Sequence, residues 1–144
     1  MDIVVKSMAT HEITSLALVQ INRLLKQVSA ESKAVSLFDL RALILNDYLF
    51  VAKTAGGDIV GMATLIHFKK TTGHVGLIED VVVDEGMRGR GIGRSLIVAA
   101  IDRARSCGLK HINLTSSPKR VAARGLYESL GFQPRNTTPF RLML

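Results

Sequence analysis

Segment 79–96 constrains the fold of this chain more than any other part of the sequence. It reads EDVVVDEGMRGRGIGRSL: an apolar run leads into a glycine-rich, basic turn and then into an amphipathic pattern. The run predicts a strand and the pattern after the turn predicts a helix. Glycines let successive backbone N–H groups point at one spot, and a helix start adds the positive end of its dipole. With Arg88, Arg90 and Arg94 beside it, the turn predicts a cradle for a polyphosphate.

Two common nucleotide-binding motifs do not fit this turn. The pattern GxxxxGK[ST] needs Lys and a hydroxyl residue directly after its last glycine, and the sequence has no such order. A dinucleotide fingerprint read from Gly89 meets Arg94 where its third glycine belongs. The ligand is therefore expected to be held by a different glycine pattern.

The remaining pattern, Arg88-x-x-Gly91-x-Gly93, resembles the [QR]xxGx[GA] signature with which the GNAT acyltransferase superfamily binds the pyrophosphate of acetyl-CoA. The resemblance implies one N-acetyltransferase domain over residues 1–144, with an α/β fold built on a mixed, mostly antiparallel sheet. It implies acetyl-CoA as the cosubstrate. The implied cofactor-binding residues of this segment are Val81, Val82, Val83, Arg88, Gly89, Arg90, Gly91, Ile92, Gly93, Arg94 and Ser95.

The expected elements have the order βααβββαβαββ, which is the GNAT order. Turn and cap signals support it: Thr10 and Ser36 as helix caps, a hairpin at 56–58, and glycines 108 and 131 after helices. Ser117 and Pro118 predict the start of the last helix. The expected strands are 2–8, 48–55, 59–69, 74–84, 109–115, 132–135 and 139–144, and the helices are 10–28, one starting at 36, 91–107 and 117–130.

Charge is unevenly distributed along the 144 residues. Residues 1–84 hold eight Lys/Arg against nine Asp/Glu, whereas residues 85–144 hold eleven against three, and the whole chain carries +7. The basic half contains the expected cradle, so its field would attract the phosphates of coenzyme A. Nucleic acid is the alternative partner of a basic surface, but seven Phe and Tyr and no Trp leave few platforms for stacking bases. We expect no nucleic-acid partner.

The remaining composition indicates the compartment and the absence of a metal. No apolar run reaches the ~18 residues of a membrane span, and the first residues do not resemble a secretion leader. One cysteine, Cys107, excludes an internal disulfide and is expected to be a small buried hydrophobe rather than a nucleophile. The four histidines lack metal-ligand spacing. We expect a cytoplasmic protein without metal or membrane partner, and leave a homodimer open beside a monomer.

Acetyl transfer to an amine needs a held thioester, a polarised carbonyl, an unprotonated amine and an acid for the departing thiolate. Run 76–83, GLIEDVVV, resembles the strand of glucosamine-6-phosphate N-acetyltransferases in which an acidic pair lies beside the acceptor amine. Glu79 is therefore the expected base, and Asp80 is expected to be structural. Strand alternation places the two carboxylates on opposite faces among apolar neighbours, where burial would raise their pKa. A structural role for Glu79 stays open, because many GNAT enzymes work through a water chain.

The resemblance also assigns roles to backbone groups and to a second motif. It implies that this strand splays from its neighbour, so that the N–H near Val81 polarises the acetyl carbonyl and Val83 pairs with pantetheine. Run 126–132, LYESLGF, resembles the LYExLGF end of the second GNAT signature and makes Tyr127 the expected general acid. The alternative for Tyr127 is packing against the sheet. Arg120 stands where many relatives have Asn, and it is expected either to meet the cofactor or to face water.

The sequence therefore predicts an N-acetyltransferase that moves the acetyl group from acetyl-CoA directly to a primary amine, without an acyl-enzyme. The resemblance around Glu79 favours a small amine, such as an amino sugar, as acceptor. Two alternatives remain: acetylation of a protein or peptide amine, and a GNAT fold that binds CoA as a sensor without turnover.

Overall fold

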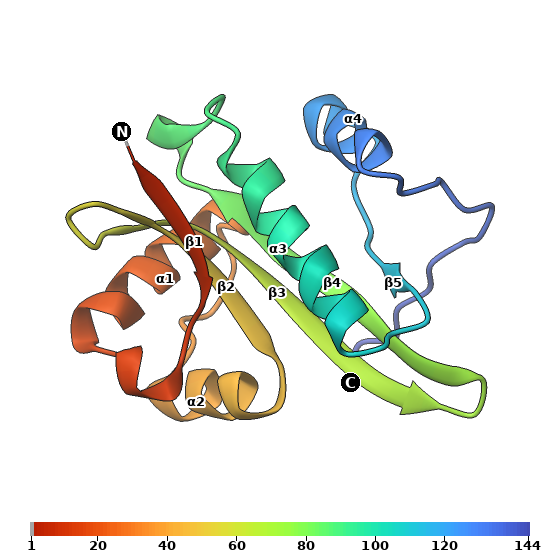
Figure 1. Cartoon of the computed structure of the whole chain (residues 1–144), viewed down its shortest axis with the longest axis horizontal. Helices are drawn as coiled ribbons and strands as arrows, with labels where there is room; N and C mark the ends of the chain where they lie inside the picture. The colour runs from red at the N-terminus through yellow and green to blue at the C-terminus, as the bar shows by residue number, and fades with distance from the viewer. Residues whose placement is uncertain (1) are drawn as a thin grey trace. The chain divides into compact units, whose positions relative to one another are not determined.

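The computed structural model describes residues 2–144, which divide into two compact units, one ending at Leu114 and one running from Thr115 to Leu144. The first unit contains a five-stranded sheet in the order β1-β2-β3-β4-β5 (Figure 1). Its strands are β1 (Ile3–Ser7), β2 (Tyr48–Thr54), β3 (Ile59–Lys70), β4 (Gly73–Val83) and β5 (Ile112–Asn113). Neighbours from β1 to β4 are antiparallel, and β5 is parallel to β4. The predicted α/β class with a mixed, mostly antiparallel sheet is confirmed.

Helices cover both faces of this sheet. One face carries α1 (Ser15–Val28) and α2 (Leu37–Asn46), and the other carries α3 (Ile92–Ser106) (Figure 1). Gly61 of β3 shows how closely α3 approaches: a Cβ there would lie 3.2 Å from side-chain carbons of both Ile92 and Leu96. A residue without a side chain at this position therefore suits the close packing of α3 on the sheet.

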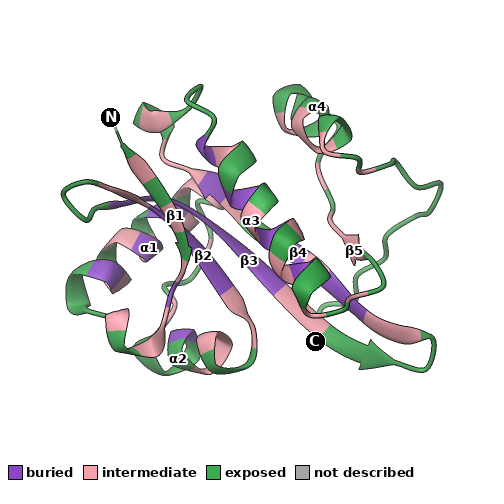
Figure 2. Cartoon of the chain, in the orientation of Figure 1, coloured by how far each residue is buried: buried purple, intermediate pink, exposed green. Residues whose placement is uncertain are grey.

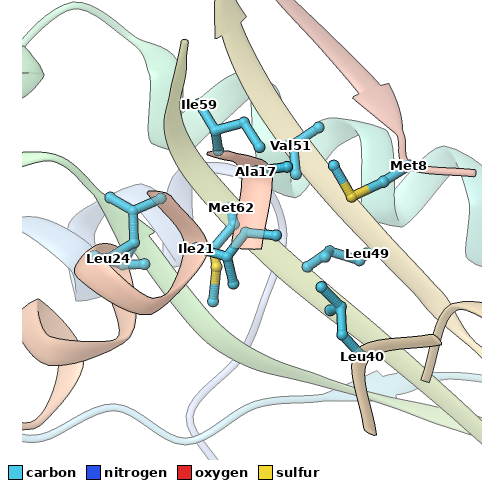
Figure 3. Close-up of a cluster of buried hydrophobic side chains, with 10 residues drawn as sticks. Met8, Ala17, Ile21, Leu24, Leu40, Leu49, Val51, Ile59 and Met62 are labelled. Carbon is cyan, nitrogen blue, oxygen red and sulfur yellow. The ribbon is translucent and has the colours of Figure 1, made fainter. Parts of the chain in front are cut away.

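The core lies on both sides of β2 and β3, which are buried over most of their length (Figure 2). On the α1 and α2 face, apolar side chains from both helices meet apolar side chains of the strands (Figure 3). This cluster consists of Met8, Ala17, Ile21, Leu24, Leu40, Leu49, Val51, Ile59, Met62 and Val82. Burial of both faces explains why these strands read as continuous apolar runs rather than as alternating ones.

In the first unit, several local predictions are confirmed, and the predicted start of α1 is wrong. Ser36 caps α2 as predicted, accepting a hydrogen bond from the Asp39 N–H at 3.1 Å, and Gly57 turns the β2–β3 hairpin with φ +90°. Helix α1 begins at Ser15 rather than after Thr10, because the Thr14 hydroxyl accepts the Ala17 N–H at 3.0 Å. Thr10 instead opens a short 3-10 helix, Thr10–Glu12.

The second unit contains one helix, α4 (Val121–Ser129), within its described residues. Its predicted start at Ser117 and Pro118 is wrong, because the Arg120 N–H donates to the Ser117 carbonyl and closes a separate turn before the helix. The predicted strands 132–135 and 139–144 are also wrong, since residues 132–144 are irregular. A strand needs a neighbouring backbone to pair with, and apolar composition alone does not supply one.

Across the part of the chain that the structure describes, no helix combines the length and apolar character needed to cross a membrane.

Candidate functional site

The predicted phosphate cradle lies between the end of β4 and the start of α3. After Val83 the chain forms a short 3-10 helix (Glu85–Met87), and α3 begins at Ile92 with Gly91 as its N-cap. Gly89 and Gly91 both have φ +78°, in the left-handed region. Residues with a Cβ avoid this region, so both turns depend on glycine.

The surroundings of the cradle suit an anion. A Cβ on Gly89 or Gly91 would meet no other atom of the chain within 4 Å, so the space above both glycines is open. Ser95 N–H donates the first helical bond of α3, to the Gly91 carbonyl at 3.1 Å, and the Ser95 hydroxyl donates to the same oxygen at 3.2 Å. The N–H groups that precede it in the helix have no acceptor inside the helix, which is the basis of anion binding at helix starts.

Three exposed arginines, Arg88, Arg90 and Arg94, surround this turn. Arg88 Nε donates to the Val83 carbonyl at 3.1 Å, which ties the turn to the last residue of β4. A guanidinium has five N–H donors, so the other four of Arg88 are not used by that bond. Arg88 can therefore hold the loop and still offer charge to a phosphate.

Strand β4 is interrupted by a bulge just before the cradle. Glu79 pairs with Thr64 and Val82 pairs with Met62, so Asp80 and Val81 together oppose the single residue Ala63. Asp80 has φ +51°, a left-handed conformation that Asp tolerates better than most residues. The bulge changes the direction of the strand and takes the backbone of Val81 out of the regular ladder.

On its other edge, β4 pairs with β5 over a short length. Within the described residues, β5 pairs with β4 at Gly76 and Leu77, and the register ends there. Residues 80–83 of β4 lie beyond this pairing. An extended ligand could form hydrogen bonds along this edge in the manner of an added strand.

The prediction that Glu79 is buried among apolar neighbours is wrong. Both Glu79 and Asp80 are exposed. Pairing with Thr64 puts Glu79 on the same face of the sheet as the core residue Val82, the face of α1 and α2, yet its side chain stays exposed there.

Tyr127 and Arg120 belong to the second unit. Burial raises the pKa of Tyr127, and the charge of Arg120 opposes this with a smaller effect. The Tyr127 ring packs edge-on against Phe132, with ring centroids 5.9 Å apart. Arg120 is exposed and precedes the first residue of α4. The packing contact is compatible with both roles considered for Tyr127, since it involves the ring and leaves the hydroxyl unassigned.

The predicted residues 81–83 and 88–95 all belong to the first unit, on either side of the 3-10 helix Glu85–Met87, and Glu79 lies in the same strand as residues 81–83. Sequence reasoning did not single out Gln27 of α1, whose side chain contacts Asp84 and Glu85 in the same stretch. Its spacing of seven residues from Gln20, on one side of a helix, is a signal that could have drawn attention to it. Residues 2–144 contain no group of three His, Cys, Asp or Glu side chains placed to hold a metal ion.

Comparisons with known proteins identify the family of this chain. The model of the acetyltransferase (GNAT) family matches residues 16–132. Glucosamine 6-phosphate N-acetyltransferase from Trypanosoma brucei brucei is 46% identical over 80 residues, covering 54% of this chain and 52% of that protein. An L-methionine sulfoximine/L-methionine sulfone acetyltransferase from Pseudomonas aeruginosa is 33% identical over 92 residues, covering 63% of this chain and 54% of that protein. The chain spans about half the length of these curated relatives.

A solved structure extends the similarity over the whole chain. The crystal structure of a Trypanosoma brucei acetyltransferase superposes with a TM-score of 0.79 at 31% identity, covering 99% of this chain and 100% of that one. The family model covers more than half of the chain, and its match includes both the cradle and the 126–132 motif. This chain belongs to the GNAT acetyltransferase family.

Proposed function

We propose that the chain is an N-acetyltransferase that transfers the acetyl group of acetyl-CoA directly to a primary amine. The observation that carries this proposal is the open glycine turn at the start of α3, which comes after a bulged strand whose last residues, 80–83, extend beyond the pairing with β5. That arrangement offers separate places for the pyrophosphate, the pantetheine arm and the acetyl carbonyl. The two units would act as one domain, a view supported by a family match that spans the sequence of both.

The cofactor would be held mainly by backbone groups. Ile92 and Val82 are buried, so their contributions would come from the main chain, together with the N–H groups of Gly89, Gly91 and Gly93. The side chains of Arg88, Arg90, Arg94 and, from the second unit, Arg120 would supply positive charge. Val83 would pair with pantetheine along the free edge of β4. Ser95 would act indirectly, since its hydroxyl fixes the Gly91 carbonyl.

The chemical step is the attack of the amine nitrogen on the thioester carbonyl. The N–C bond forms as the C–S bond breaks, and the backbone N–H near Val81 stabilises the charge that develops on the carbonyl oxygen. Glu79 would accept the proton of the amine, directly or through water, and its exposure suits a base that meets a substrate from solution. Tyr127 would protonate the thiolate. A raised pKa keeps the phenol in its proton-donating form at neutral pH.

A small amine is the proposed acceptor. The run GLIEDVVV resembles that of glucosamine-6-phosphate N-acetyltransferases, and one curated relative carries that name. One relative is named for an amino-acid derivative and another is named an N-alpha-acetyltransferase, which widens the range of amines worth testing.

The test is the amine-dependent release of free thiol from acetyl-CoA, with mass spectrometry of the product. The panel would contain glucosamine 6-phosphate, glucosamine, an amino-acid amide, a polyamine and a short peptide. A higher kcat/KM for one of the small amines than for the peptide supports the proposal. A higher kcat/KM for the peptide would mean that the acceptor is a protein or peptide amine. Tight binding of acetyl-CoA without turnover on any amine would identify a sensor instead.

A further inference from the structure

Two glutamines on α1 make the same pair of hydrogen bonds to two different loops. Gln20 Nε2 donates to Asp58 Oδ1 at 2.8 Å, and its Oε1 accepts the N–H of Ile59 at 3.0 Å. Gln27 Nε2 donates to Asp84 Oδ1 at 2.9 Å, and its Oε1 accepts the N–H of Glu85 at 3.0 Å. The two side chains are seven residues apart, about two helical turns, and therefore lie on the same side of α1.

The two loops lead to different parts of the chain. Asp58 ends the β2–β3 hairpin, which continues only into β3. Asp84 instead lies directly after β4 and opens the 3-10 helix that leads to Arg88 and the cradle. Gln27 thus holds the entry to the proposed cofactor site directly, whereas Gln20 holds the hairpin turn and is linked to Asp84 only through Val60, the residue after Ile59.

Asp84 is the point at which this entry is fixed. Its N–H donates to the Val60 carbonyl at 2.8 Å, and its own carbonyl accepts the Met87 N–H at 2.8 Å. Its carboxylate accepts the Gln27 amide, and the Arg23 guanidinium lies 3.7 Å away. Since Arg23 is largely exposed, its ion pair contributes little, and the hydrogen bond from Gln27 is the stronger constraint on the carboxylate.

We infer that Gln27 is a positioning residue for the phosphate cradle, which it orients through Asp84 and Glu85 without contacting the cofactor. The inference rests on the proposed function. Gln27 holds the side chain of Asp84 and the backbone N–H of Glu85. Without these two hydrogen bonds, the backbone between Asp84 and Arg88 can adopt other conformations. The N–H groups of the cradle then converge less well, and acetyl-CoA binds more weakly.

Gln27→Glu tests this inference, with Gln20→Glu as its matched control. Each variant keeps the size and the acceptor oxygen but replaces the donated amide with a carboxylate against an aspartate. Loss of one hydrogen bond to a charged group corresponds to about tenfold or more in an equilibrium constant. We expect the Kd and the KM for acetyl-CoA to rise about tenfold in Gln27→Glu and less than about twofold in Gln20→Glu. Both variants should lose similar thermal stability, and the KM for the amine should not change.

Gln27→Met, which lacks both hydrogen bonds but carries no charge, covers the case in which Gln27→Glu does not fold. It should show the same weaker binding of acetyl-CoA by calorimetry, with Gln20→Met as its control. Equal affinities in the Gln27 and Gln20 variants would overturn the inference while leaving the proposed function intact. Failure of the unaltered chain to bind acetyl-CoA would overturn the proposed function and this inference together.

Discussion

Gly91→Glu separates the conformational role of the cradle glycine from its role in binding. Gly91 has φ +78°, and a Cβ there would meet nothing within 4 Å, so the substitution causes no steric clash inside the protein. The remaining cost is the left-handed backbone, about 1–2 kcal/mol for a residue with a side chain. For a domain of this size that corresponds to a fall in Tm of roughly 2–8 °C. The fold should therefore persist.

Binding of acetyl-CoA should suffer much more. A carboxylate ~4 Å from a phosphate is repelled by about 1 kcal/mol in water and about 4 kcal/mol at the effective dielectric near a protein surface. This corresponds to an increase in Kd of about fivefold to several hundredfold, and high salt should reduce it. Gly91→Ala, which adds no charge, should fall between Gly91→Glu and the unaltered chain.

Gly108 provides the matched control at the opposite end of α3. It has φ +70°, and a Cβ there would also meet nothing within 4 Å. Gly108→Glu should therefore lose about as much stability as Gly91→Glu while keeping its affinity for acetyl-CoA. Calorimetric titration with acetyl-CoA and thermal denaturation of all four proteins measure both effects. Equal affinities in the two glutamate variants would refute the assignment of Gly91 to the phosphate site.

Three further predictions concern titratable residues. Glu79→Gln should lower kcat by roughly 10²-fold or more and move the acid limb of the pH–rate profile, whereas Asp80→Asn should do neither. Rates of these two variants within about twofold of each other would mean that Glu79 has a structural role. Tyr127→Phe should lower kcat by ~10²–10⁴-fold and flatten the alkaline limb of the pH–rate profile. Its Tm should change little, because the ring still packs on Phe132. Unchanged turnover with a lower Tm would mean that the Tyr127 hydroxyl has a structural role. The hydrogen bond from Lys6, with smaller help from the Ala9 N–H and nearby positive charge, lowers the pKa of Glu12 from 4.5 to about 2 against the effect of burial. The stability that this carboxylate contributes is therefore present above pH 4.5 and lost as the pH falls toward 2. The free energy of unfolding of Glu12→Gln, measured by denaturation at several pH values, should lack this loss. The same fall with pH in Glu12→Gln and in the unaltered chain would contradict the assignment.

The sequence by itself determined the features that depend on a few neighbouring residues. The left-handed turns at Gly89 and Gly91 arise from the absence of a side chain, and the start of α2 arises from the Ser36 hydroxyl and the Asp39 N–H three residues away. Gly57 and Gly108 likewise end their elements with positive φ angles. Such signals need no tertiary contact, so the cradle and most element boundaries could be predicted.

Features that depend on pairing between distant segments were decided by the tertiary structure. Apolar neighbours along β4 predicted a buried Glu79, but the folded chain leaves it exposed, and the register with β3 places a bulge directly after it. The final segments were predicted as strands from their composition, yet no strand of the second unit pairs with them among its described residues. The bond between Gln27 and Asp84 joins residues 57 positions apart. Local sequence records which groups can form hydrogen bonds, whereas packing of the whole chain decides which of them meet.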